Sequence, residues 1–527
     1  MPTNGPPTTV GVCGAGTMGR GIAQAAALGG MRALVWDPVE GVTGQALEQI
    51  AAALAKGAER GRWAREEAAA ARERVAAAAE LAALADCELV IEAAPEDLAV
   101  KHELLGRVAE VVGGDCVLAT NTSSLLVTAV AAPVPRPERV VGLHFFNPAP
   151  LMRLVEVVAG EDSAPWALDR AAAAGEAMGK RAIRAADVAG FVVNRCNRPF
   201  GLEALRAVEQ RRAGFAQVDR LCRLAGFRMG PFELSDLVGV DVGLDVARSF
   251  HEQSFGEPRW RPSPIAARMV AAGRNGRKAG RGYYDYRDGP HRPDDPPAPA
   301  AGDGDGLVVV AGDGVLAGEL AAIAADAGWE VATPAQAEGE VPFLIVDCGA
   351  AEEDPPLQGG PRAICCADGS LAALDPGGGA AGFHALPPLA AAGAVELTRG
   401  ADTTDAAVAA AERFFTTLGK RIEWVGDGPG LVLGTIVCQL VNEAAFALGE
   451  GVAEAEDIDA GMVLGLNHPR GPLAWGDEIG LDHVLSVLEA LRFESGDPAY
   501  RPAPALRRRV LEGRVGVQSG EGFHRHG

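Results

Sequence analysis

The stretch "TTVGVCGAGTMGRGIAQAAALGG" at residues 8–30 decides the fold of this chain. It runs from an apolar strand pattern through a glycine-rich turn into a helical pattern, and a second apolar run, "ALVWD", follows at 33–37. In a strand–turn–helix of this kind the glycines permit a tight turn, and the helix N-terminus can face a pyrophosphate. The order therefore predicts a dinucleotide site formed by Gly14, Gly16, Thr17, Met18, Gly19 and Asp37.

The acid in this set indicates which dinucleotide is bound. Asp37 ends the second apolar run, about 20 residues beyond the glycine turn, where a carboxylate can accept hydrogen bonds from the adenine ribose. The same carboxylate would repel a 2′-phosphate. We therefore expect NAD and not NADP. A strand–helix turn with a purely structural purpose is the alternative.

The strand and helix alternation continues as far as "RVVGLHFFNP" at 139–148. Such alternation predicts a doubly wound, mostly parallel sheet, so we expect an α/β Rossmann-like NAD-binding domain over residues 1–189. From Gly190 the pattern becomes helical without strand runs, which predicts an all-α domain over 190–287. The segment 288–306 is rich in Pro, Gly and Asp and is typical of a linker.

The second half of the chain repeats the first. The stretch "GLHFFNPAPLMRLVEVV" at 142–158 aligns with "GFHALPPLAAAGAVELT" at 382–398, and "LVIEAA" at 89–94 aligns with "LIVDCG" at 344–349. A period of this length indicates duplication in tandem and not a solenoid. We expect a degenerate Rossmann-like domain, truncated between its second and third strands, over 307–428 and a second helical domain over 429–527.

His144 and Glu156 are the first chemical candidates, because each copy keeps a histidine and a glutamate at this spacing. A carboxylate that hydrogen-bonds one imidazole nitrogen fixes the ring tautomer, so that the other nitrogen can remove a hydroxyl proton. Beside a nicotinamide, this pair would make an alcohol dehydrogenase. The alternative is a buried pair that only satisfies its own hydrogen bonds.

Composition limits the possible partners and the location. Forty-eight Lys and Arg residues against 70 Asp and Glu residues give a formal charge of −22, which disfavours nucleic acid and anionic membrane surfaces. Nine cysteines without a C-x-x-C pair indicate a reducing compartment and no metal site. No apolar run approaches the roughly 20 residues that span a bilayer. We expect a cytoplasmic protein.

Six motifs in order resemble the 3-hydroxyacyl-CoA dehydrogenase family: "GAGTMGRGIA", "IEAAPEDLAVKHEL", "NTSSL", "GLHFFNPAPLMRLVEVV", "GFVVNR" and "GRGYYDY". The resemblance covers residues 8–286 and implies a NAD-binding domain followed by a helical domain. A chain of this length with a second, eroded copy resembles the members that oxidise 3-hydroxyadipyl-CoA in bacterial phenylacetate degradation.

The resemblance also implies roles for individual residues. His144 would be the general base and Glu156 its orienting partner, while Ser123 would hydrogen-bond the C3 oxygen of the substrate and Asn194 would bind near its carbonyl. A turn residue and a helix cap are the structural alternatives for Ser123 and Asn194. Further positions near the cofactor would be Glu92, Lys101 and Asn121, and Lys56 is the candidate for the CoA phosphates, although solvated or capping charges are the alternative for the lysines and the glutamate.

The second copy has lost most of what the chemistry requires. Ser123 aligns with Gly369 and Asn194 aligns with Gly434. We therefore expect a catalytically silent second sheet domain, in which His384 and Glu396 persist as an internal hydrogen-bonded pair. The second helical domain is expected to pack on the first, either as an intrachain pseudo-dimer in a monomer or within a homodimer.

The predicted activity is NAD-dependent oxidation of a 3-hydroxyacyl-CoA to the 3-oxoacyl-CoA, in fatty-acid or phenylacetate-type catabolism. The acyl chain, 3-hydroxybutyryl or 3-hydroxyadipyl, stays open. One alternative is a hydroxy-acid dehydrogenase without CoA, resembling the gulonate dehydrogenase and lambda-crystallin branch. Another is a non-catalytic NAD- or CoA-binding protein.

Overall fold

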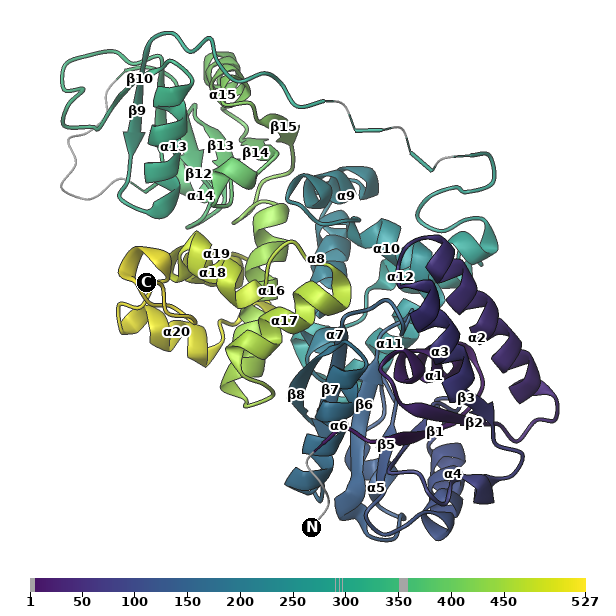
Figure 1. The fold of residues 1–527 in the computed structure, drawn as a ribbon. Coiled ribbons are helices and arrows are strands. Elements are labelled where there is room, and N and C mark those ends of the chain that lie inside the picture. Colours follow the sequence, from purple (N-terminus) through teal and green to yellow (C-terminus); the bar gives the residue numbers. More distant parts are fainter. Residues whose placement is uncertain (1–4, 290, 293, 296, 350–358) are drawn as a thin grey trace. The chain divides into compact units, whose positions relative to one another are not determined.

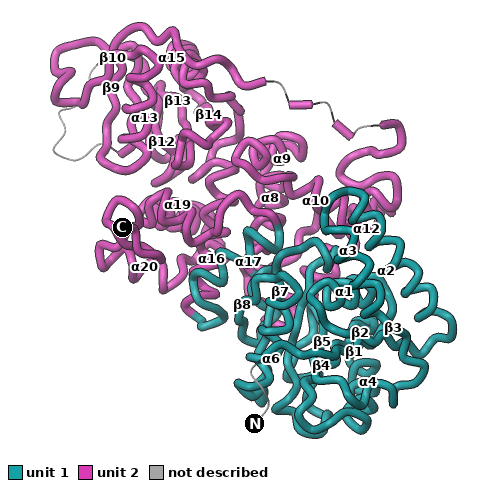
Figure 2. Tube along the Cα trace, in the orientation of Figure 1, with its two compact units in different colours: residues 1–195, 450–466 teal, residues 196–449, 467–527 magenta. Residues whose placement is uncertain are grey.

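The computed structural model describes residues 5–289, 291–292, 294–295, 297–349 and 359–527. The chain divides into two compact units (Figure 2). Unit 1 comprises residues 1–195 and 450–466, and unit 2 comprises 196–449 and 467–527. Each unit contains one β-sheet (Figure 1).

The sheet of unit 1 has eight strands in the order β3-β2-β1-β4-β5-β6-β7-β8. All neighbouring pairs are parallel except β6 and β7, which are antiparallel. This is the doubly wound arrangement that the alternating pattern predicts. The strands are β1 (Thr9–Cys13), β2 (Arg32–Trp36), β3 (Val75–Ala77), β4 (Leu89–Glu92), β5 (Val117–Thr120), β6 (Val140–Phe145), β7 (Leu154–Ala159) and β8 (Arg181–Ala186).

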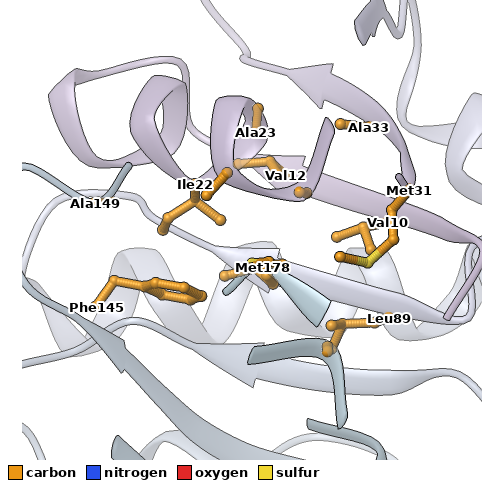
Figure 3. Packing of buried hydrophobic residues seen from close by; sticks show 14 of the residues in the cluster. Val10, Val12, Ile22, Ala23, Met31, Ala33, Leu89, Phe145, Ala149 and Met178 are labelled. Carbon is orange, nitrogen blue, oxygen red and sulfur yellow. The ribbon is translucent and has the colours of Figure 1, made fainter. Parts of the chain in front are cut away.

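Helices cover both faces of this sheet because alternate strand residues point to opposite faces. Val10 and Val12 of β1 pack with Ile22 of α1 in one apolar cluster (Figure 3), to which α2, α3 and α6 also contribute. Cys13 lies in a second cluster, with residues of α4 and α5. The helices are α1 (Thr17–Leu28), α2 (Val42–Glu59), α3 (Arg65–Arg74), α4 (Leu98–Val111), α5 (Val127–Ala131), α6 (Pro165–Ala177), α7 (Val193–Cys196) and α17 (Ala455–Leu466).

The sheet of unit 2 has seven strands in the order β10-β9-β11-β12-β13-β14-β15, again with one antiparallel pair, β13 and β14. Among the described residues, the order matches that of unit 1 without a strand in the place of β3. The strands are β9 (Leu307–Ala311), β10 (Glu330–Ala332), β11 (Leu344–Asp347), β12 (Arg362–Cys365), β13 (Ala381–His384), β14 (Ala394–Arg399) and β15 (Arg421–Trp424), with helices α13 (Val315–Asp326), α14 (Leu371–Leu374) and α15 (Asp405–Thr417).

The other helices of unit 2 come from both halves of the sequence. Every residue of α16 from Leu433 to Ala447 is buried, including the polar Gln439, Asn442 and Glu443. It packs along α8, and Arg259 Nη1 donates to Glu443 Oε2 over 2.7 Å. These helices are α8 (Arg198–Glu209), α9 (Phe215–Leu224), α10 (Pro231–Val238), α11 (Val240–Gln253), α12 (Pro264–Ala271), α16 (Leu433–Gly449), α18 (Pro472–Ile479), α19 (Leu481–Ser495) and α20 (Pro504–Leu511).

In the described part of the chain, no helix combines the length and apolar character that crossing a membrane requires. Within the same residues, no three His, Cys, Asp or Glu side chains come together as a group that could hold a metal ion.

Candidate active site

The glycine turn between β1 and α1 has the space that a dinucleotide needs. Gly14 has a φ of +108°, and a Cβ there would lie 2.5 Å from the Ala93 carbonyl oxygen. A Cβ at Gly19 would lie 1.8 Å from the Gly14 oxygen, so the helix packs against the strand end only because both residues are glycine. At Gly16, by contrast, a Cβ would meet no atom within 4 Å. The open position is where a ligand can approach the backbone.

The start of α1 offers unsatisfied donors to that open position. Gly16 is the N-cap residue, no side chain caps the helix, and no acidic residue lies in its first turn. The first amides of a helix have no intrahelical acceptor and carry the positive end of the helix dipole. Thr17 is exposed here, and Met18 packs partly against the apolar cluster. The turn therefore fits a pyrophosphate.

Asp37 lies beside the same turn. One of its carboxylate oxygens accepts from the Ala15 amide over 2.8 Å and the other accepts from the Val39 amide over 3.0 Å. The carboxylate is thereby fixed at the end of β2, next to the glycines, where the sequence analysis expects a ribose.

His144 and Glu156 form a buried pair at the edge where β6 and β7 run antiparallel. The two residues are direct partners in the strand register, and His144 Nδ1 lies 2.6 Å from Glu156 Oε2. Glu156 is fully buried and His144 is 6% exposed. The other carboxylate oxygen, Oε1, accepts from the Val192 and Val193 amides, each over 3.0 Å.

Two aromatic rings border the imidazole of His144. The ring centroids of Phe146 and Phe191 lie 4.6 Å and 5.8 Å from that of the histidine. Phe191 has a φ of +51°, a left-handed conformation that is strained for a bulky residue. This conformation lies immediately before the two amides that bind Glu156, where backbone strain is a common feature of functional sites.

Glu96, which the sequence analysis did not single out, organises the loop that carries Ser123. Its Oε1 accepts from the Ser123 and Ser124 amides over 2.9 Å each and from the Thr122 hydroxyl over 2.7 Å. Burial would raise the pKa of Glu96, but these hydrogen bonds and the charge of Lys101 outweigh it and lower the pKa to about 2. Ser123 itself is exposed, and its hydroxyl lies 3.5 Å from Glu96.

Glu92 and Lys101 bind each other. Lys101 Nζ lies 2.8 Å from Glu92 Oε1 and 3.3 Å from Glu96 Oε2, and the lysine is 1% exposed. Thr120 donates to the other oxygen of Glu92 over 2.6 Å. The network ties the start of α4 to the end of β4, and it also supports the Ser123 loop through Glu96.

Asn121 connects this network to the histidine strand. Its Oδ1 accepts from the amide of Phe145, the residue after His144, over 2.8 Å, while its own amide donates to the Glu92 carbonyl oxygen over 2.9 Å. Asn194 is half-buried in α7 and follows directly on Val193, whose amide binds Glu156. Lys56 is exposed in the last turn of α2.

The corresponding pair in unit 2 is arranged differently. His384 and Glu396 are also direct partners across antiparallel strands, but His384 Nε2 lies 3.1 Å from His483 Nε2, and its buried Nδ1 has no hydrogen-bond partner in the described residues. The expectation of a persisting His384–Glu396 hydrogen bond is therefore wrong. The cause is Gly434, because a Cβ there would lie 2.2 Å from His384 Cε1. The imidazole occupies the space that a side chain would fill.

The buried groups around His384 have shifted pKa values. Burial, together with the nearby His483, holds the pKa of His384 well below its ordinary value, and burial also lowers the pKa of His483. Burial raises the pKa of Glu396 to about 7, despite hydrogen bonds from the Leu433 and Val432 amides. The pair in unit 2 thus favours its uncharged forms.

Some site features were missing from the sequence analysis. Glu96 stands among three acids in "EAAPED" at 92–97, and nothing in that run distinguishes it. The Val192 and Val193 amides are backbone groups, which a residue pattern does not display. The preceding Gly190, with a φ of +71°, was the available signal of an unusual turn.

Comparisons with known proteins agree with this architecture. Residues 9–188 match the family described as "3-hydroxyacyl-CoA dehydrogenase, NAD binding domain", and residues 190–286 and 430–526 each match "3-hydroxyacyl-CoA dehydrogenase, C-terminal domain". The chain is 35% identical to the 3-hydroxyadipyl-CoA dehydrogenase of Escherichia coli K12, over 95% of this chain and 97% of that protein. It is 41% identical to a 3-hydroxybutyryl-CoA dehydrogenase of Mycobacterium tuberculosis, over 53% of this chain and 98% of that protein.

A solved structure matches nearly the whole length of the chain. The crystal structure of 3-hydroxybutyryl-CoA dehydrogenase from Escherichia coli K12 matches with a TM-score of 0.81 and 33% identity, covering 96% of this chain and 98% of that one. The doubly wound sheet and its open glycine turn define the class, a NAD-dependent oxidoreductase. Within that class, the chain belongs to the 3-hydroxyacyl-CoA dehydrogenase family.

Proposed function

We propose that this protein oxidises a 3-hydroxyacyl-CoA to the 3-oxoacyl-CoA, with His144 as the general base. The observation that carries the proposal is the 2.6 Å contact between His144 Nδ1 and the fully buried Glu156 in the unit that also holds the glycine turn. The relatives named as 3-hydroxyadipyl- and 3-hydroxybutyryl-CoA dehydrogenases support the substrate class. NAD, when bound, supplies the acceptor for the hydride of the alcohol.

The protein's own contribution begins with the proton. With Glu156 ionised, Nδ1 keeps the ring proton and donates a hydrogen bond to the carboxylate, which leaves Nε2 to accept the proton of the substrate hydroxyl. The Val192 and Val193 amides hold the second carboxylate oxygen, so Glu156 cannot turn away from the ring. The pair therefore stabilises the imidazolium that forms as the alcohol becomes a ketone.

The remaining site residues are proposed to hold the two reactants. The exposed Ser123 hydroxyl would donate to the C3 oxygen, and Asn194 would bind near the thioester carbonyl, which restricts rotation of the substrate. The cofactor would be held by Gly14, Gly16, Thr17, Met18, Gly19 and Asp37. Asn121 would also contribute, as would Glu92 and Lys101 through their mutual ion pair. Lys56, exposed on α2, would contact the CoA phosphates.

We further propose that the chain arose by tandem duplication, with the domain bounds 1–189, 190–287, 307–428 and 429–527 and a linker at 288–306. The equal strand order of the two sheets supports this, as do matched buried acids in the helical stretches. Asp236 accepts from two amides of "GRGYY", and Asp477 accepts from two amides of "GEGFH". We expect the α8–α16 contact to act as an intrachain pseudo-dimer. The nine cysteines, none of which forms a disulfide, support a cytoplasmic location.

Steady-state kinetics tests the function. We expect oxidation of NADH in the presence of acetoacetyl-CoA and none in the presence of acetoacetate, since the family acts on thioesters. Turnover of acetoacetate alone would contradict the proposal and favour a hydroxy-acid dehydrogenase without CoA. A comparison of kcat/KM for 3-hydroxybutyryl-CoA and 3-hydroxyadipyl-CoA then assigns the acyl chain.

A further inference from the structure

Helix α17 lies in the second helical stretch of the sequence but packs in unit 1. Residues 450–466 belong to that unit, and α17 contacts β7, which carries Glu156, and β8 (Figure 2). The aligned helix of the first stretch, α9, packs in unit 2, where its Leu224 carbonyl oxygen accepts from the Gly393 amide over 3.0 Å. Each sheet is thus supported by a helix from the other half of the sequence.

Two glycines of α17 lie against side chains of the segments that hold Glu156. A Cβ at Gly465 would lie 2.8 Å from Leu154 Cδ2 and 3.3 Å from Val193 Cγ1. A Cβ at Gly461 would lie 3.1 Å from Ile183 Cδ1 and 3.2 Å from Val193 Cγ2. The two glycines are four residues apart and share one helix face. Glycine is unfavourable inside a helix, so two on the contact face indicate a close packing requirement.

The contacted residues are the immediate neighbours of the site. Leu154 begins β7, two residues before Glu156, and the Val193 amide donates to Glu156 Oε1. Movement of either residue would shift the carboxylate relative to His144. The glycine face of α17 therefore lies against side chains of both segments that position Glu156.

Polar contacts fix the segment at its N-terminal side. Glu450 Oε2 accepts from Arg195 Nη2 over 2.6 Å, and Arg195, the residue after Asn194, is 2% exposed. The Val452 carbonyl oxygen accepts from the Ala186 amide over 2.8 Å. Asp457 accepts from the Arg184 amide and from Arg181 Nη2, each over 3.0 Å. These bonds leave α17 little freedom to retreat from an added side chain.

We propose that Gly465 and Gly461 are positioning residues for the His144–Glu156 pair, so that the second copy of the helical stretch completes the site of the first. The inference rests on the proposed function. It gives the second copy a part in catalysis even though that copy has glycines in place of Ser123 and Asn194. The geometry assigns the larger effect to Gly465, where the first contact, at 2.8 Å, is closer.

The test compares Gly465→Val with Gly106→Val in the full-length protein. Gly106 is also inside a helix of unit 1, but a Cβ there would meet no atom within 4 Å. We expect Gly465→Val to lower kcat by about 10- to 100-fold through displacement of the pair, while the affinity for NADH is unchanged. The acidic limb of the pH–rate profile should move to lower pH, because an imidazole that loses its carboxylate is less basic. Gly106→Val should match the wild type.

A milder variant keeps the test informative in the event that Gly465→Val does not fold. Gly465→Ala adds one carbon, and Leu154→Val in the same chain removes the carbon that this methyl would meet, so the double variant should recover most of the lost kcat. The proposal is overturned if kcat per folded molecule and the pH–rate profile of both Gly465 variants equal those of the wild type. If the wild type itself does not turn over 3-hydroxyacyl-CoA, the proposed function fails instead, which separates the two outcomes.

Discussion

The His144 pair of unit 1 and the His384 pair of unit 2 share their register, yet only one histidine binds its glutamate. In both sheets the two residues are direct partners across antiparallel strands. His144 lies 2.6 Å from Glu156, whereas His384 has turned to His483. The difference teaches that strand register brings a histidine and a glutamate together but does not decide what they bond.

Neighbouring residues determine which hydrogen bond each histidine forms. Gly434, aligned with Asn194, leaves the space into which the His384 ring has moved, and His483, aligned with Val242, offers that ring a new partner. Asp313 in the turn "GDGVLAG" of the second half would place an anion where a pyrophosphate has to lie, so we expect no cofactor at that turn. Loss of the substrate contact that we propose for Asn194 and loss of the pair's geometry therefore have the same cause.

The largest expected difference between the two pairs is catalytic. His144→Ala should lower kcat by about 100- to 10,000-fold, because the general base is removed. Binding of NADH, measured by fluorescence, should be unchanged. His384→Ala is the matched control, and its kcat per folded molecule should equal that of the wild type. If His384→Ala proved to be the inactive variant, the assignment of the two sites would be reversed.

The glutamates should differ less, since they act through the histidines. Glu156→Gln keeps the shape and the backbone hydrogen bonds but removes the charge that stabilises the imidazolium, so we expect kcat to fall by about 10- to 100-fold, less than on loss of the base itself. Glu396→Gln should leave kcat unaltered. Steady-state kinetics near neutral pH checks both, and equal rates for wild type and Glu156→Gln would contradict the orienting role.

Much of this contrast could be predicted from the sequence, because it depends on periodic patterns. The order of strands, the glycine turn and the placement of His144 opposite Glu156 follow from local patterns and alignment. The contact of His384 with His483 could not be predicted, because it depends on the space beside Gly434, a residue 50 positions away in the sequence. Likewise, the sequence offered Glu92 and Lys101 as two separate cofactor contacts, whereas their 2.8 Å bond arises from how α4 returns to the end of β4.

Restoring the lost side chain in unit 2 tests the steric explanation. Gly434→Asn places a Cβ 2.2 Å from His384, so we expect the free energy of unfolding to fall by about 1–3 kcal/mol, as for other overpacked cores. The control is Gly201→Asn in α8 of the same unit, where a Cβ meets nothing within 4 Å. Denaturant unfolding measures both. An unchanged midpoint for Gly434→Asn would show that His384 moves away without cost.

A last expected difference lies in how stability depends on pH. His384 and His483 have lowered pKa values in the folded chain, whereas an unfolded histidine takes up its proton near pH 6.5, so each contributes stability that is lost as the pH falls below 6.5. Glu396, raised to about 7 from 4.5, has the opposite sign, because its contribution is lost as the pH rises toward 7.

Comparing each variant with the wild type isolates these contributions, because the contributions of the other titrating groups cancel in the difference. The difference in unfolding free energy between wild type and Glu396→Gln should change between pH 4.5 and 7 by up to about 1.4 kcal/mol per pH unit, the value for one proton, in favour of the wild type at low pH. The difference between wild type and a His384→Asn/His483→Asn variant should change in the reverse direction below pH 6.5. Parallel pH curves for all three proteins would mean that these groups titrate normally in the folded chain. In that case the second pair would not be held in its uncharged form, and the structural contrast with His144 and Glu156 would rest on hydrogen-bond geometry alone.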